Sequence, residues 1–141
     1  MTFSLTFHVD LNPVPKGRPR FSKVGGFVRS YTPKKTSDYE TQVKAIAQSV
    51  MAREPLETPL AAFLYFRLPI PKSYPKKRIQ ACLEGLEKPI KKPDLDNLAK
   101  SVLDGLNGVV YKDDSQLVSL HITKVYANNP GVDVMVREEL P

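Results

Sequence analysis

Alternating apolar and polar residues predict four β-strands in this chain. Thr2 to Asp10 and Val132 to Val136 carry apolar side chains at every second position, which is typical of half-buried strands. Leu60 to Leu68 alternates but is apolar on both faces, so we expect a central strand covered on both sides. Leu117 to Tyr126 also alternates. One of its faces is formed by Val118, Leu120 and Ile122.

A glycine pair, Gly25-Gly26, predicts a tight turn between two further short strands, 20–24 and 27–31. Cations along this segment alternate with the aromatic residues Phe21, Phe27 and Tyr31. Two interpretations are open. The segment is either an arm that binds DNA phosphates, with aromatic side chains against sugars or bases, or a solvated hairpin whose aromatic side chains join the core.

Apolar residues spaced three and four apart predict a helix that we assign to the scaffold. The first helix starts near Ser37, which can form a capping box with Glu40, and runs to about Arg53. A shorter helix opens at Lys76 and closes at Gly85.

A third helix is predicted with Asp96 as its N-cap, an apolar set at three- and four-residue spacing that includes Leu95 and Leu106, and Asn107-Gly108 as its end. If the chain is extended from Asp94 to Asp96, both carboxylates lie on the same side, and Leu95 points to the core. Lys100 comes one helical turn after Asp96, on the same face as the carboxylates.

Together these elements predict one domain, residues 1–141, of the α/β or α+β class, with a single mixed sheet and helices packed on it. The single cysteine, Cys82, excludes a cysteine zinc site and is expected to be a small buried apolar residue. Neither a signal peptide nor an apolar run of the roughly 20 residues that span a bilayer is visible, so we expect a cytoplasmic protein and no membrane partner.

Charge is distributed unevenly along a basic chain of 21 Lys and Arg against 15 Asp and Glu. Residues 94–114 hold five acids and two cations, whereas residues 16–35 hold seven cations and no acid. Residues 72–92 hold seven cations and two acids. An acidic segment inside a basic frame fits carboxylates that hold a metal ion while a polyanion lies on the surrounding cations.

The acidic segment suits phosphodiester hydrolysis, which needs an activated water and neutralised phosphoryl oxygens. Magnesium prefers oxygen ligands, so Asp94 and Asp96 can hold an ion from one side and an acid of Asp113-Asp114 from another. Lys100 can orient a carboxylate or place its charge against the scissile phosphate. The alternative needs no metal: a capping Asp, a Lys one turn later and an acidic turn are ordinary helix features.

The residues predicted to contact DNA are cations of the two basic segments. They are Lys16, Arg18, Arg20, Lys23, Arg29, Lys76, Lys77, Arg78, Lys91 and Lys92.

Two motifs carry a family resemblance that covers most of the chain. Lys92-Pro93-Asp94-Leu95-Asp96-Asn97-Leu98-Ala99-Lys100, followed by Asp113-Asp114-Ser115-Gln116, resembles the RusA family of Holliday junction resolvases, found in bacteria and their prophages. Lys16-Gly17-Arg18-Pro19-Arg20 and Tyr31-Thr32-Pro33 are also similar to members of that family.

The resemblance implies a homodimeric, Mg²⁺-dependent endonuclease, with Mn²⁺ as a substitute, that makes paired symmetric nicks in four-way DNA junctions during recombination and repair. It places the catalytic and metal-binding acids on Asp94, Asp96 and Asp114, and the catalytic lysine on Lys100. Asp113 is the alternative third acid, because the spacing from Lys100 is slightly shorter than in the best-known member.

Other functions stay open beside this one. The chain could be a DNA-junction-binding protein without catalysis, or a less selective metal-dependent nuclease. A phosphatase for small esters fits less well, because a small substrate does not need so many cations.

Overall fold

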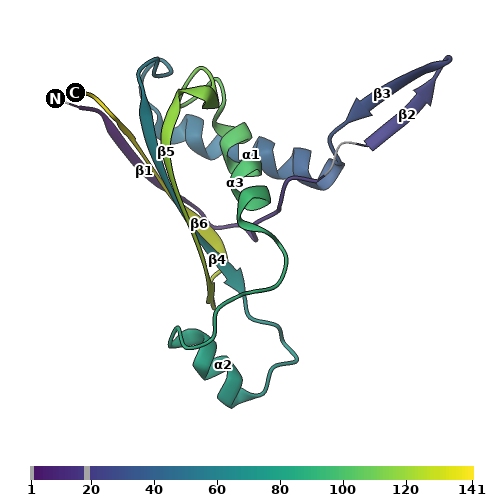
Figure 1. Ribbon diagram of the computed structural model, residues 1–141, viewed down its shortest axis with the longest axis vertical. Helices are drawn as coiled ribbons and strands as arrows, with labels where there is room; N and C mark the ends of the chain where they lie inside the picture. The colour runs from purple at the N-terminus through teal and green to yellow at the C-terminus, as the bar shows by residue number, and fades with distance from the viewer. Residues whose placement is uncertain (1, 18–19) are drawn as a thin grey trace.

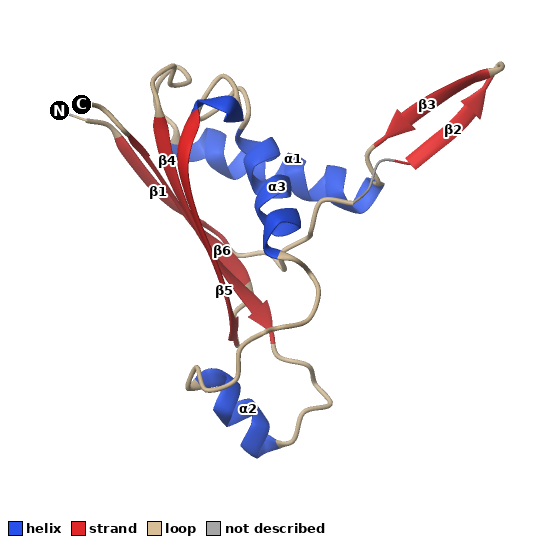
Figure 2. Cartoon of the chain, in the orientation of Figure 1, coloured by secondary structure: helices blue, strands red, loops and turns tan. Residues whose placement is uncertain are grey.

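The computed structural model describes residues 2–17 and 20–141, which form a four-stranded mixed sheet, a separate two-stranded hairpin and three α-helices (Figures 1 and 2). This confirms the predicted α+β class. The strands are β1 (Ser4–Val9), β2 (Arg20–Val24), β3 (Phe27–Tyr31), β4 (Leu60–Pro69), β5 (Leu117–Ala127) and β6 (Gly131–Glu138). The helices are α1 (Lys34–Val50), α2 (Lys76–Leu83), α3 (Leu95–Leu106) and a short 3₁₀ helix, η1 (Asp114–Gln116). No described helix is long and apolar enough to cross a membrane.

Strand β4 is central, as predicted, in a sheet of order β1-β6-β4-β5. It pairs antiparallel with β6 and parallel with β5. Because two parallel neighbours cannot be joined by a tight turn, the chain leaves the sheet after β4 and returns to β5 through α2, α3 and η1. This crossover carries all the predicted acidic site residues.

One face of the sheet is covered by α1 and α3 (Figure 1). Phe66 of β4 and Val134 of β6 belong to the same buried cluster as Val43 of α1 and Val102 of α3. The predicted cover on both faces of β4 is wrong. On the opposite face Tyr65 is exposed, because no described helix packs there, and β4 is apolar on that side only in part.

Helices α1 and α3 approach each other most closely at Gly105. A Cβ atom there would lie 2.9 Å from Cγ1 of Val43 and 3.0 Å from the carbonyl oxygen of Glu40. The absence of a side chain therefore permits the contact, and this close approach brings Glu40 of α1 next to the preceding residue of α3, Asp104.

The start of α1 differs from the prediction. The helix begins at Lys34, and Pro33 precedes it without a side-chain cap, so the Ser37–Glu40 capping box is absent. The reason is tertiary: Thr36 is buried, and its hydroxyl donates to the carbonyl of Pro15 and accepts from the amide of Gly17. Proline suits the first turn of a helix because it has no N–H to satisfy there.

The hairpin of β2 and β3 extends away from the rest of the molecule (Figure 1). The predicted strands pair antiparallel, and Gly25 and Gly26 form the turn with φ angles of 57° and 86°. Phe21 and Phe27 are 70% and 75% exposed, so the alternative in which these aromatic side chains join the core is wrong.

Helix α2 and strand β5 also lie where the sequence predicts them. Helix α2 begins at Lys76 as predicted, and its Cys82 is buried as expected. Strand β5 forms as its alternation predicts, but the face that carries Val118 is not buried, and Val118 is 67% exposed. Strand β5 lies at the sheet edge, where α1 and α3 leave its outer side chains uncovered.

Candidate active site

Two carboxylates stand at the N-terminus of α3. Asp94 is the N-cap, with extended backbone (φ −73°, ψ 150°), and its carbonyl oxygen accepts the first helical bond from Leu98 at 3.1 Å. The predictions that Asp96 is the cap and that Asp94–Asp96 is extended are therefore wrong. Asp96 lies in the first turn, and Leu95 is 38% exposed rather than in the core. Negative charge is favourable at this end of a helix.

Lys100 lies one turn after Asp96, as predicted, and faces two acids. Its amine donates to Oδ1 of Asp104 at 2.8 Å and to Oδ2 of Asp114 at 3.4 Å. The hydrogen bond to Asp104 is the main cause that raises the pKa of Lys100 above its ordinary value. Lys100 is thus a positive charge held between α3 and η1.

Asp104 contacts both Lys100 and Lys16. Its Oδ2 lies 3.0 Å from the amine of Lys16, which also donates to Glu40 at 2.7 Å. Burial alone would raise the pKa of Asp104, but hydrogen bonds from Lys100 and Lys16 leave it below its ordinary value. Lys16, predicted to bind DNA, therefore has its amine held by two carboxylates in this structure.

The Asp-Asp-Ser-Gln motif forms the turn that places Asp114. Oδ2 of Asp113 accepts from the amide of Ser115 at 3.0 Å, and Oε1 of Gln116 accepts from the amide of Asp113 at 3.0 Å. Gln116 also anchors the turn by donating to the carbonyls of Leu56 and Thr58. Asp113 thus builds the turn, whereas Asp114 faces Lys100.

The donor chemistry of this region fits a hard cation. Asp94, Asp96 and Asp114 offer only carboxylate oxygens, and within residues 2–17 and 20–141 neither Asp94 nor Asp96 has a hydrogen-bonding or ion-pairing partner for its side chain. The same residues contain no group of three His, Cys, Asp or Glu that converges on one point. Magnesium does not require such a group, because it takes one or two protein carboxylates and completes its shell with water and phosphate oxygens.

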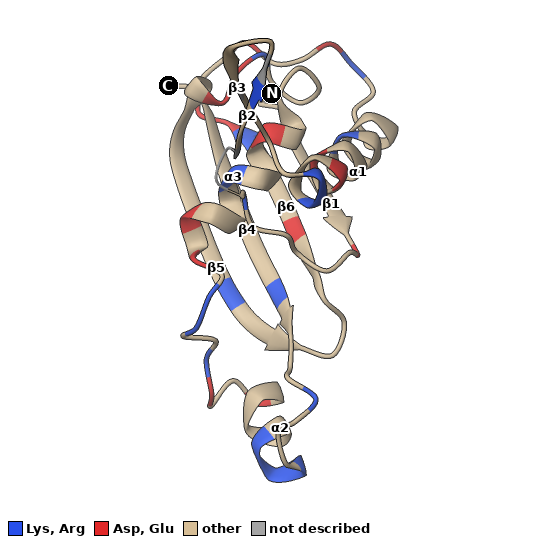
Figure 3. Cartoon of the chain, turned by 90° about the vertical axis from the view of Figure 1, so that its right-hand side faces the viewer, with Lys and Arg blue, Asp and Glu red and all other residues tan. Residues whose placement is uncertain are grey.

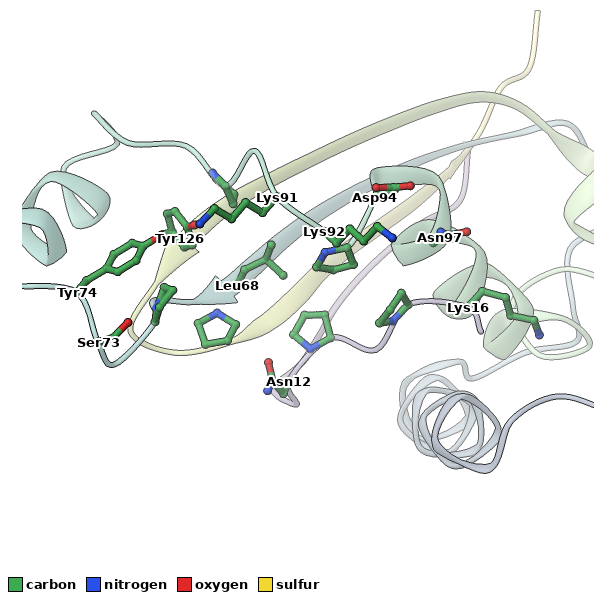
Figure 4. A pocket seen from close by; sticks show the side chains of 16 residues that line it. Asn12, Lys16, Leu68, Ser73, Tyr74, Lys91, Lys92, Asp94, Asn97 and Tyr126 are labelled. Carbon is green, nitrogen blue, oxygen red and sulfur yellow. The ribbon is translucent and has the colours of Figure 1, made fainter. Parts of the chain in front are cut away.

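Beside Asp94 lies a cleft of about 740 Å³. It runs between the segment from Asn12 to Lys16, the end of β4 and the crossover segment that leads to α3 (Figure 4). Asp94 and Asn97 line one end of the cleft, and Tyr74 and Tyr126 line the other.

The predicted DNA-binding cations lie on α2, beside the cleft and on the hairpin of β2 and β3. Lys76 and Lys77 open α2, where Figure 3 shows the Lys and Arg colour, and the exposed Lys91 and Lys92 line the cleft. Within the described residues, no carboxylate lies within ion-pair distance of these four amines. Arg78 differs, because Glu87 binds its guanidinium at 2.9 Å. The exposed Lys23 lies on the hairpin; Arg18 and the side chains of Arg20 and Arg29 fall outside the described part of the structure.

Sequence reasoning missed the role of Asp104 and Glu40. Asp104 lies four residues after Lys100, a spacing that brings side chains together on a helix, so this contact could have been found. The contact of Lys16 with Glu40 and Asp104 carries no local signal, since it depends on how α1 and α3 pack.

Comparison with known proteins identifies the family of the chain. The family model described as endodeoxyribonuclease RusA matches residues 10–137. The chain is also 38% identical over 136 residues to a Bacillus subtilis (strain 168) protein described as uncharacterized protein YqaN, covering 95% of this chain and 96% of that protein. The match extends over nearly the whole chain, including both acidic motifs.

Proposed function

Because the chain belongs to the RusA family of endodeoxyribonucleases, we propose that it resolves four-way DNA junctions by paired symmetric nicks in a Mg²⁺-dependent reaction. Family membership supports a Holliday junction endonuclease. The single observation that supports the finer proposal is the exposed surface of α3. There Asp94 is the N-cap, Asp96 precedes Lys100 by about one turn, and Lys100 faces Asp114.

In this proposal Asp94, Asp96 and Asp114 are the candidate metal ligands, and a bound ion would take one or two of these carboxylates and complete its shell with water and phosphate oxygens. Bound Mg²⁺ supplies a more acidic water and neutralises charge on the phosphate. Asp114 suits this role better than Asp113, because its 3.4 Å contact with Lys100 is long for a hydrogen bond and is easily exchanged. Asp113 has one oxygen committed to the amide of Ser115.

Lys100 acts as a fixed cation toward the phosphoryl oxygens. Its hydrogen bond to Asp104 raises its pKa and so favours the protonated, positively charged form. A positive charge placed in advance near developing negative charge stabilises the transition state without reorganisation.

Paired nicks need two active sites, and the proposal therefore includes a two-fold homodimer. A four-way junction has approximate two-fold symmetry, so a two-fold dimer can place one site on each of two opposed strands. Such an activity would serve DNA recombination and repair. The mass of the protein in solution, measured at the concentration of the cleavage assay, tests the dimer.

The test of the function is incubation with an end-labelled synthetic four-way junction, with Mg²⁺ or with a chelator, beside a linear duplex of the same sequence. We expect symmetric nicks in two opposed strands with Mg²⁺ or Mn²⁺ and none with chelator. Equal cleavage of the duplex would leave a nuclease without junction selectivity. Binding without cleavage in either metal would leave a junction-binding protein.

Lys76 and Lys77 are expected to bind phosphates of the junction arms. Replacing both with Ala should weaken junction binding and lower the slope of log affinity against log salt by about 1 for each lysine that contacts a phosphate. Affinity measured over a range of salt concentrations checks this. Arg53→Ala is a control for the loss of a positive charge elsewhere, because Arg53 lies in the loop before β4, whereas α2 follows the other end of that strand. An unchanged slope in the lysine variant would exclude α2 from the interface.

A further inference from the structure

The cleft beside Asp94 combines flat apolar walls with polar and charged side chains. Its volume of about 740 Å³ lies in the range of small-ligand sites. Six prolines and two tyrosines make up half of the sixteen residues that line it, and most of the others are polar or charged. The prolines are Pro13, Pro15, Pro69, Pro71, Pro89 and Pro93.

Tyr74 and Tyr126, at the end of the cleft away from Asp94, are held in place by their neighbours. Their rings lie 6.4 Å apart and nearly perpendicular, at 74°. The guanidinium carbon of Arg78 lies 3.6 Å from the centre of the Tyr74 ring, and Glu87 fixes that guanidinium. Burial and a hydrogen bond with Tyr74 raise the pKa of Tyr126 to about 12, so its hydroxyl stays neutral. An aromatic surface fixed before binding loses little freedom when a ligand arrives.

Hydrogen bonds also hold the two side walls of the cleft against the rest of the fold. The amine of Lys124, on β5, donates to the carbonyls of Lys91 and Pro93 at 2.9 Å each. On the other side, the amide of Lys16 donates to the carbonyl of Asn97 at 2.8 Å, and the hydroxyl of Ser101 donates to the carbonyl of Val14 at 2.6 Å. The cleft is therefore formed without its ligand.

The charges around the cleft indicate an anionic ligand that continues to the active site. Lys91 and Lys92 are exposed on its rim, and Figure 4 shows them between the tyrosine end and the Asp94 end. Asp94 belongs to the proposed metal site. A ligand with a flat apolar body, phosphates for the lysines and a continuation toward Asp94 has the chemistry of a DNA strand.

From these observations, and resting on the proposed function, we propose that the cleft holds one unstacked nucleotide of the strand being cut, next to the scissile phosphate. The base and sugar pack against the prolines and against Tyr74 and Tyr126, while the neighbouring phosphates lie near Lys91 and Lys92. Bases in a continuous duplex are stacked and would have to be extruded, whereas a nucleotide at a branch point is released at lower cost. The cleft thereby favours branched DNA over plain duplex.

The test combines a change in the protein with a change in the DNA. Tyr74→Ala and a junction with an abasic nucleotide next to the cut should each weaken binding by about tenfold, the scale of one base–aromatic contact. Together they should weaken it hardly further, because both remove the same contact. Tyr74→Phe should recover most of the binding that Tyr74→Ala loses, since it keeps the ring.

A second variant tests the cleft without removing the Tyr74 ring, in case Tyr74→Ala fails to fold. Ser73 is exposed and lines the cleft, so Ser73→Trp should fill the cleft from the surface and weaken binding of the intact junction by a similar factor. Independent, multiplicative losses in the combined experiment, or an equal loss for an abasic nucleotide placed far from the cut, would overturn the proposed subsite. If wild-type protein neither binds nor cuts the junction, the proposed function itself fails.

Discussion

Asp94→Asn is expected to lower the rate of junction cleavage by about a thousandfold or more while binding is kept or tightened. The substitution removes a proposed metal ligand, and the loss of several kcal/mol of charge stabilisation at the phosphate corresponds to about this factor. Binding should not weaken, because one negative charge near the DNA backbone is removed. Single-turnover cleavage and junction affinity, measured on the same preparation, check both parts.

Asp38→Asn is the matched control for this experiment. It makes the same chemical change on α1, where Asp38 pairs with Lys34 in an exposed ion pair and has no place in the proposed site. We expect cleavage within about twofold of wild type, because exposed ion pairs contribute little. If Asp94→Asn cleaves at the wild-type rate, Asp94 is only a helix cap and the metal site must lie elsewhere.

Asp104→Asn is expected to lower cleavage by about 10- to 100-fold through its effect on Lys100. Asp104 holds the amine of Lys100 at 2.8 Å and that of Lys16 at 3.0 Å, so the amide leaves both lysines without their shared carboxylate. A misplaced catalytic group commonly reduces the rate by such factors. The free energy of unfolding should also fall by about 1–3 kcal/mol, because a largely buried charge pair is broken. Single-turnover rates and thermal unfolding are the measurements.

Glu40→Gln separates a positioning role for Asp104 from a purely structural one. It removes the other partner of Lys16 but does not touch Lys100. We therefore expect lower stability with cleavage close to wild type. Asp104→Glu, which keeps the charge, should recover part of the lost cleavage. Equal loss of cleavage in Glu40→Gln and Asp104→Asn at equal stability would assign both residues to the scaffold alone.

Local patterns in the sequence determined most of the secondary structure. Alternation located β1, β4 and β6, and the glycine pair located the hairpin, because strand faces and tight turns depend on a few consecutive residues. The contact of Lys100 with Asp104 is local too, since it follows from four-residue spacing on one helix. The family followed from short motifs of the same kind.

Tertiary packing decided where α1 begins, and the first backbone bond of α3 decided where that helix begins. Ser37 and Asp96 are good caps by type, yet α1 starts earlier because Thr36 is buried against the segment from Pro15 to Gly17. Helix α3 starts at Leu95 because Asp94 already accepts the first helical bond. Local propensity offers several caps, and the packed structure selects one of them.

In the candidate active site, too, some features follow from local sequence and others from tertiary packing. The sequence placed acids and a lysine near one another along the chain, because they lie within or close to one helix. Only the tertiary structure decided which acid of Asp113-Asp114 faces Lys100, which carboxylates hold Lys16, and that a cleft opens beside Asp94. These features join segments distant in sequence, and their contacts depend on the close approach of α1 to α3 and on the path of the crossover after β4.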